Sequence, residues 1–227
     1  MALSRQMRGF RRKTAAARRE ALIDATLQNL QRYGHAGTSI RRISAAAGVS
    51  IGLINHHFKA KSELIAAAYE SLALSLQKSL RDRAQDDSAN ARDRISGFFR
   101  ASFGPEFLDP AVFNTWLVFW SMVLHSPQMR AVHDRTYRRY RSLLESLLES
   151  LVAAGDAPRF TPRRAAIALS ALLDGLWVEI SLNPATFKPA EAVAICEDWV
   201  DALCSASLPR MQRAPARRRR SARSGRG

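Results

Sequence analysis

The chain has 227 residues, 47% of them apolar, and a formal net charge of +15. This apolar content is enough for one mid-sized domain or two small ones and excludes an intrinsically disordered chain. The charge lies at the ends, because residues 1–19 carry seven basic side chains and residues 210–227 carry eight, with no acid in either segment.

The charge of the interior then indicates where a nucleic acid would bind. Residues 20–209 are formally neutral, but 20–61 have a balance of +3 and 62–209 a balance of −3. This polarity favours DNA binding by the N-terminal third. We expect residues 1–17 to form a disordered basic arm and 208–227 a disordered Arg-rich tail, which adds phosphate attraction or only solubility.

Helical periodicity recurs along the chain, and no stretch alternates with the period of a strand, which predicts an all-α fold. A first helix has an apolar face and ends at Gly34, a glycine suited to a left-handed cap. Its face comprises Leu22, Ile23, Thr26, Leu27, Leu30 and Tyr33. A short second helix contains Ile40, Ile43 and Ala47, and a third follows Ser50. A long helix covers 62–83, and Phe98, Phe99 and Phe103 belong to another.

Later helix starts are marked by a capping residue before a proline, at Asp109-Pro110, Ser126-Pro127 and Thr161-Pro162. They predict helices over about 110–125, 127–154 and 162–182, and a last one over 189–205. The total is about nine. The pattern indicates an N-terminal three-helix head, residues 18–61, mounted on a larger helical bundle, residues 62–207.

Several classes of protein are not expected from these residues. The basic N-terminus has no apolar segment behind it, and the longest apolar run, Trp116–Leu124, is too short to cross a bilayer, so we expect a cytoplasmic protein without a membrane partner. Cys196 and Cys204 would lie roughly 12 Å apart along one helix and stay reduced. The five histidines lack metal-ligand spacing, and no phosphate loop or nucleophile motif is present. We therefore predict no enzyme, catalytic residue, metal or cofactor.

The segment 38–58 has the pattern of a helix-turn-helix. Thr38 can cap a helix that ends before Gly48, whose tolerance of positive φ permits the sharp turn, and Ser50 can cap the next helix. Small residues at 45–47 allow the helices to cross closely, while Val49, Ile54 and Phe58 can bury against the first helix. The alternative is an ordinary helical hairpin in which His56 and His57 are solvated.

The residues Gly48-Val49-Ser50, followed by His57-Phe58-x-x-Lys61-x-x-Leu64, resemble the DNA-binding signature of the TetR family of repressors over 18–65. This implies a recognition helix in the major groove, with Asn55 able to bond both N6 and N7 of adenine. Implied base contacts are Ser50, Ile51, Asn55 and His56, and implied phosphate contacts are Thr38, Arg42, His57 and Lys61, helped by the N-terminus of the helix near Ser62. Two departures are Asn55, where the family often has an aromatic residue, and Ala60, where it often has Ser or Asn.

The resemblance also implies a homodimer on a palindromic double-stranded DNA operator, since paired recognition helices meet successive major grooves. The family's usual interface would be formed by helices 162–182 and 189–205. Small residues there permit close approach of a partner, or equally close packing inside one subunit. They are Ala165, Ala166, Ala168, Ala171, Ala192 and Ala194.

Residues 112–124 are apolar nearly all round, which indicates a helix buried on most sides. Asp174 is an acid in an otherwise apolar helix, so it needs a partner. The stretches Trp116-Leu-x-Phe119-Trp120 and Leu173-Asp-Gly-Leu-Trp177 resemble the C-terminal domain of BetI-type, choline-responsive repressors over about 110–182. This implies a small-molecule effector pocket for a cation such as choline. Its candidate residues are Phe103, Trp116, Phe119, Trp120, Asp174 and Trp177.

Other interpretations remain open at this point. One alternative is that each aromatic residue packs in the core, and that Asp174 caps a helix or pairs with an arginine such as Arg139 or Arg164. Others are that the regulator controls an efflux or catabolic operon through a hydrophobic effector, that it activates transcription, or that it is a nonspecific architectural DNA binder that relies on its basic tails. If a pocket exists, the helix 62–83 is the expected lever, because it alone is expected to join the head to the bundle.

Overall fold

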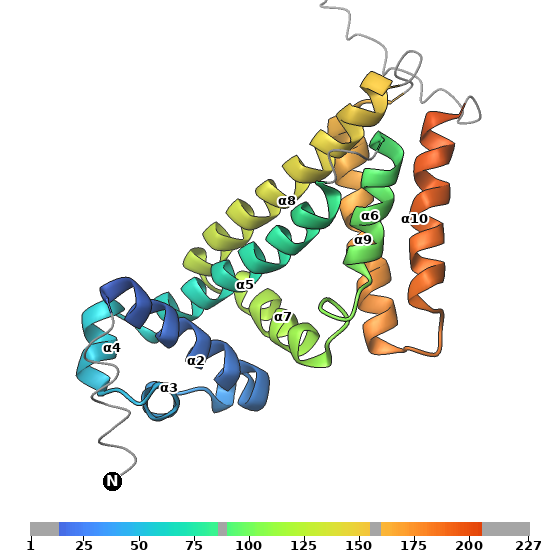
Figure 1. Cartoon of the computed structure of the whole chain (residues 1–227). Helices are drawn as coiled ribbons and strands as arrows, with labels where there is room; N and C mark the ends of the chain where they lie inside the picture. Colours follow the sequence, from blue (N-terminus) through green and yellow to red (C-terminus); the bar gives the residue numbers. More distant parts are fainter. Residues whose placement is uncertain (1–13, 86–89, 155–159, 206–227) are drawn as a thin grey trace, which may run out of the picture.

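The structure is a computed structural model that describes residues 14–85, 90–154 and 160–205, and these residues form nine α-helices and no strand (Figure 1). The all-α prediction is confirmed. The predicted arm and tail lie largely outside the described residues. The helices are α2 (Ala15–Gly37), α3 (Ile40–Ala47), α4 (Ile51–His57), α5 (Lys61–Ala84), α6 (Ala91–Ser102), α7 (Pro110–Val123), α8 (Pro127–Ala154), α9 (Pro162–Leu182) and α10 (Pro189–Cys204).

Helices α2, α3 and α4 form the head. The start of α2 is fixed by Thr14, whose side chain accepts a hydrogen bond from the Ala17 N–H at 3.2 Å. Gly34 adopts φ 61° and ψ −172°, which is not helical, and a further short turn follows it up to Gly37. The regular helix therefore stops at Gly34 as predicted and φ is positive there, but ψ is not that of a left-handed cap.

The predicted cap of the second helix is wrong by one residue. Ser39, not Thr38, caps α3 by accepting from the Arg42 N–H at 3.3 Å. Thr38 is buried, and its hydroxyl donates to the Gly34 carbonyl at 2.7 Å. The turn itself follows the prediction: Gly48 is left-handed, with φ 66° and ψ 37°, and Ser50 caps α4 by accepting from the Leu53 N–H at 3.2 Å.

Two clusters of buried side chains organise the molecule. One holds the head together around Leu22, Ile43, Ile54 and Phe58 and continues into the first half of α5. The other fills the bundle between α5, α6, α8, α9 and α10. Three helices contribute to both clusters, namely α5, α7 and α8.

The expectation that α5 alone joins the head to the bundle is therefore wrong. Helix α7 packs against α2 and also places Phe119 in the head cluster and Phe113 in the bundle cluster. Figure 1 shows α7 below α5, between the head and α9. The head thus rests on the bundle through two separate contacts.

Helix α9 is the one described helix long and apolar enough to span a membrane by length and composition. It is not the segment considered in the sequence, Trp116–Leu124, which lies in α7 and at its C-terminal end. One side of α9 is a core face, with Ala166, Leu169 and Leu173 buried, and α9 packs along α8. Its apolar composition is accounted for in part by this packing. Cys196 is buried and Cys204 exposed, and both are free thiols.

Candidate DNA interface and effector pocket

The outer surface of α4 carries the side chains expected to contact bases. Ile51, Asn55 and His56 are all exposed, and residues 51 and 55 share a face because they are one helical turn apart. The Ser50 side chain is exposed as well, but its oxygen caps the helix. Ile54, between them, is fully buried and anchors α4 to the head.

His57 lies at the edge of this surface and is half-buried. Its Nε2 is buried with no hydrogen-bond partner among the described residues. Burial lowers the pKa of its imidazole, and the neighbouring positive charges of His56, Arg18 and Arg19 lower it further. A phosphate would supply a partner for this side chain.

The two other cations expected to hold phosphates meet at the corner between α2 and α3. Arg42 donates to the Gly37 carbonyl at 2.6 Å and its guanidinium lies 4.5 Å from the ring centre of Tyr33. The Lys61 ammonium donates to the Thr38 carbonyl at 2.7 Å. These bonds position the two charges side by side along the backbone, while the Thr38 hydroxyl points inward.

The N-terminus of α5 differs from the expectation. It begins at Lys61 without a side-chain cap, and Glu63 in its first turn accepts from the Lys59 N–H at 2.8 Å. The Glu63 carboxylate opposes a phosphate at this helix end. The cationic side chains, rather than the helix dipole, are the favourable groups for DNA here.

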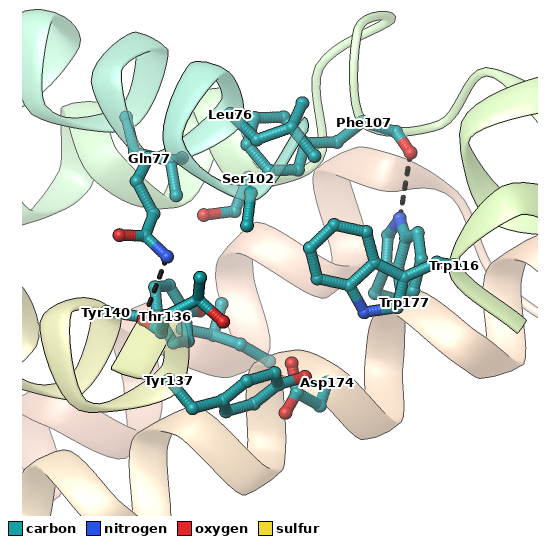
Figure 2. A pocket seen from close by; sticks show the side chains of 13 residues that line it. Leu76, Gln77, Ser102, Phe107, Trp116, Thr136, Tyr137, Tyr140, Asp174 and Trp177 are labelled. Carbon is teal, nitrogen blue, oxygen red and sulfur yellow. Dashed lines mark hydrogen bonds between the residues drawn. The ribbon is translucent and has the colours of Figure 1, made fainter. Parts of the chain in front are cut away.

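A cavity of about 80 Å³ opens among α5, α7, α8, α9, the end of α6 and the loop before α7 (Figure 2). Three of the six candidate pocket residues line it, namely Trp116, Asp174 and Trp177. The full lining is Ala73, Leu76, Gln77, Leu80, Ser102, Phe107, Trp116, Thr136, Tyr137, Tyr140, Leu173, Asp174 and Trp177.

The other three candidates do not line the cavity. Phe103 is a buried core residue of the bundle, and Phe119 is fully buried in the head cluster, where its ring stacks on Tyr69 at 4.7 Å. Trp120 contacts the rings of Trp116 and Trp177, at 6.5 and 6.1 Å between centroids. It supports the cavity wall from outside the cavity.

Sequence reasoning missed the wall contributed by α8. Tyr137 and Tyr140 lie one turn apart, with centroids 6.2 Å from each other, and both line the cavity. They are flanked by Arg138, Arg139 and Arg141, so the segment looks like a solvated surface. The i, i+3 spacing of the two tyrosines is the signal that pointed inward.

Asp174 is the only acid among the lining residues of this cavity. Burial raises the pKa of its carboxyl to about 6, against the hydrogen bond from Tyr137 and the positive charge of Arg141, which lower it. Figure 2 shows the Tyr137 ring beside this carboxyl. Among the described residues no cation lies within 4.0 Å of it, and neither Arg139 nor Arg164 pairs with it.

The other polar side chains of the lining already use donors inside the protein. Gln77 donates to the Thr136 carbonyl at 2.9 Å, the Thr136 hydroxyl to the Val132 carbonyl at 3.0 Å, and the Ser102 hydroxyl to the Phe98 carbonyl at 2.9 Å. Trp177 donates its indole N–H to the Phe107 carbonyl at 2.8 Å. Each of these four side chains therefore already has one donor in use within the protein.

A helix-turn-helix with an exposed second helix, carried by a helical bundle that encloses a pocket, defines a DNA-binding transcriptional regulator. Residues 22–68 match the family model described as bacterial regulatory proteins of the tetR family, and residues 91–205 match the BetI-type transcriptional repressor C-terminal domain. The chain belongs to the TetR family of transcriptional repressors and carries a BetI-type C-terminal domain. Both resemblances inferred from the sequence are confirmed.

Similar proteins agree with this assignment. The transcriptional regulator BetI of Paraburkholderia xenovorans LB400 is 34% identical over 185 residues, which are 81% of this chain and 92% of that protein. BetI of Serratia proteamaculans 568 is also 34% identical, over 81% of this chain and 90% of its own.

Solved structures show the same architecture. One described as a transcriptional regulator from Pseudomonas aeruginosa PAO1 is 47% identical, with a TM-score of 0.78, and covers 86% of this chain and 93% of its own. Another, from Saccharomonospora viridis, was solved in complex with choline. It is 18% identical, with a TM-score of 0.68, covers 82% of this chain and 96% of its own, and shows the shared fold alone.

The raised pKa of Asp174 makes a stability prediction. Between the ordinary value of 3.8 and about 6, the folded state holds a proton that the unfolded state has lost. The free energy of unfolding should therefore fall as the pH rises from 4 to 7, by up to about 3 kcal/mol from this one group. Asp174→Asn should reduce that slope, measured by urea unfolding across this pH range.

The matched control is Asp24→Asn, at an exposed position of α2. It should keep the wild-type slope. Identical slopes for the wild type and Asp174→Asn would show that the carboxyl titrates normally and is not held in a desolvated site.

Proposed function

We propose that the protein is a dimeric repressor that binds a palindromic operator through α4. We further propose that it dissociates from the operator when a choline-like cation binds in the cavity beside Asp174. The observation that supports the sensing function most directly is the Asp174 carboxyl, which is half-buried among aromatic rings and has no cation within 4.0 Å among the described residues. A desolvated acid of this kind favours a positively charged guest. No catalytic role is proposed.

For DNA, we propose that α4 enters the major groove and that Asn55 reads an adenine, with Ser50, Ile51 and His56 beside it. Arg42, His57 and Lys61 would contact phosphates on either side and set the register. Thr38 contributes through its carbonyl, which holds the Lys61 ammonium at 2.7 Å. The exposure of this surface supports the assignment, since it is built on buried Ile54 and Phe58.

The operator is best located by footprinting a fragment that contains residues 14–205 only. A repressor should still protect a defined palindrome, whereas an architectural protein that binds through its basic tails should lose most of its affinity and show no defined site.

Substitution of Asn55 separates base reading from phosphate binding. Asn55→Ala should weaken operator binding by about 1–3 kcal/mol and leave binding to a scrambled duplex unchanged, because the lost contact is to a base. Lys61→Gln should weaken both and reduce the salt dependence by about one counterion. Fluorescence anisotropy at several salt concentrations measures both effects. Equal losses on the two duplexes for Asn55→Ala would argue against base reading.

For the effector, the cavity offers the chemistry that binds a quaternary ammonium. The faces of Trp116, Trp177 and Tyr137 attract a desolvated cation, and Asp174 supplies the countercharge. A volume of about 80 Å³ is several times the roughly 10–15 Å³ that one water needs, so the guest should be compact. The regulator of the same fold from Saccharomonospora viridis is in complex with choline, which is consistent with this proposal.

Release would follow from the position of Trp116. Its ring lies 6.3 Å from that of Trp177 in the bundle and 5.4 Å from that of Tyr69 on α5, between centroids. A guest in contact with Trp116 therefore affects the packing of α7 and α5, two of the three helices that belong to both buried clusters. A ligand that prefers the conformation with badly spaced heads weakens DNA binding by its differential affinity for the two states.

Three small molecules test the pocket by titration calorimetry. Choline should bind. Its uncharged analogue 3,3-dimethyl-1-butanol should bind at least about tenfold more weakly, because it lacks the charge that Asp174 and the rings attract. Glycine betaine should also bind weakly, since its carboxylate would face Asp174 and acceptor oxygens. Equal affinity for choline and the neutral analogue would favour a hydrophobic effector instead.

The affinity for choline should also depend on pH. Below about 6, the value to which the carboxyl pKa is raised, a proton competes with the cation, and the affinity should fall by up to about tenfold per pH unit. Asp174→Asn should bind weakly and with a flat profile. A choline affinity that is unchanged between pH 5 and pH 8 would remove Asp174 from the binding site.

For the dimer, the unburied side of α9 supplies an apolar surface. Ile167 is 49% exposed, Leu182 is 65% exposed, and Ala171 and Gly175 between them are exposed too. Three of the six alanines noted in the sequence pack inside the subunit, while three face outward. The inward set is Ala165, Ala166 and Ala192, and the outward set is Ala168, Ala171 and Ala194.

A charge placed in this surface should separate the subunits. Ala171→Glu should convert a dimer into a folded monomer and weaken operator binding, because two linked half-sites become one. The control is Leu124→Glu, at a leucine that is 72% exposed at the end of α7. Light scattering at micromolar concentration measures the mass, and a monomeric wild type would refute the dimer.

A further inference from the structure

A second hollow lies at the end of α5 that is farthest from the head. It is formed by the last turn of α5, the first turn of α6 and the middle of α8, which lie together in Figure 1. Its volume is about 450 Å³. The lining residues used below are Arg81, Arg94, Arg138, Arg139, Leu143 and Leu147.

Four of the residues that line this hollow are arginines, and they come from all three helices. Arg94 is fixed by a hydrogen bond from its Nε to the Ala84 carbonyl at 3.1 Å. Arg81, Arg138 and Arg139 form no side-chain hydrogen bond or ion pair with the described residues, and none of the described residues that line the hollow is acidic. Within the described part of the chain, the four guanidinium groups therefore share one concave surface whose lining contains no carboxylate.

Other arginines of the bundle are balanced differently. Arg92 of α6 bonds Asp201 of α10 at 2.8 Å, and Arg135 of α8 bonds Glu70 of α5 at 3.4 Å. These pairs tie helices together. Arg81, Arg138 and Arg139 form no such pair among the described residues, and the mutual repulsion of the four arginines favours the approach of an anion.

The shape of the hollow suits an anion with an organic part. Guanidinium groups bind phosphate oxygens in pairs and hold more than one phosphate when they are clustered. The base of the hollow is apolar, because Ala84 and Leu147 are buried and Leu143 is half-buried. A volume of this size falls within the range of small-molecule sites.

Operator DNA is not the natural occupant. The hollow is separated from the phosphate-binding corner by most of the length of α5, since Lys61 and Arg81 lie about 30 Å apart along that helix. The base-reading helix α4 is at the opposite end of the molecule in Figure 1. The anion that fits here is therefore a separate ligand.

We propose that the hollow bounded by Arg81, Arg94, Arg138 and Arg139 binds a small organic anion that carries two or more phosphate groups, of about the size of a nucleotide. This site is distinct from the effector pocket, because the two have no lining residue in common. It does not depend on the identity of the effector.

The test uses the full chain and ATP without Mg²⁺ as the probe, at 150 mM NaCl, by titration calorimetry and thermal unfolding. Wild type should bind ATP saturably and its Tm should rise with ATP concentration. Arg138→Gln/Arg139→Gln should bind at least about tenfold more weakly, the loss expected when two charge-assisted contacts are removed. Arg163→Gln, at an exposed arginine of α9, should behave as wild type. The basic termini are present in all three proteins, so their background cancels.

Three results would overturn the proposal. The first is ATP binding that does not saturate or that falls equally in both variants, since this would be attraction to net charge. The second is citrate binding as tightly as ATP, which would refute the phosphate class. The third is a loss of operator affinity rather than ATP affinity in the double variant, which would make the hollow a DNA contact. Choline binding in the double variant should match wild type, so failure here leaves the proposed repressor intact.

Discussion

The side chain of Tyr69 is the point at which the head and the bundle meet. It is fully buried in the middle of α5, its ring stacks on Phe119 of α7 at 4.7 Å, and its hydroxyl lies 2.8 Å from His133 Nδ1 of α8. The ring of Trp116 also packs against the Tyr69 ring, in a T-shaped arrangement with 5.4 Å between the centroids. Because these contacts join the three helices that belong to both buried clusters, the angle between head and bundle depends on how tightly this group packs.

The pocket lies directly beside this junction, and its chemistry is unfavourable when it is empty. A carboxyl with a pKa raised to about 6 is still mostly ionised at neutral pH, so the folded protein carries a poorly solvated charge. The ionised Asp174 carboxyl therefore lowers the stability of the folded protein, and it does so at the proposed ligand site. Such local costs are typical of binding sites, and under the proposed function a cation held by the aromatic walls around Asp174 would relieve the cost.

Much of the fold could be predicted because its signals are local. Asp109 before Pro110 starts α7 as predicted, and Gly48 takes the left-handed conformation that the turn requires. Errors arose where several local solutions are equivalent. Thr38 and Ser39 can both cap a helix, and burial of Thr38 under the α2–α3 corner decides between them. Gly34 adopts positive φ, yet the chain resumes one more turn.

The pocket was only half predictable for a different reason. Periodicity shows that α7 is surrounded, but not which aromatic residue faces a cavity and which fills a core, so Trp116 and Phe119 look alike in sequence. Tyr137 shares a helix with many arginines, and its orientation is set by the packing of α8 on α9. The exposed face of α4 was easier to predict, because exposure on this short helix follows from its single buried residue, Ile54.

The double contact of α7 bears on how such a regulator can evolve. Trp116 touches both the pocket and the junction, so a substitution that suits a new ligand there also alters the unliganded head, and repression changes together with recognition. Asp174 and Trp177 lie on α9, which contributes nothing to the head cluster. Substitutions at Asp174 or Trp177 can therefore change ligand preference with less effect on the head. Relatives that respond to different molecules should differ at these two positions before they differ at Trp116.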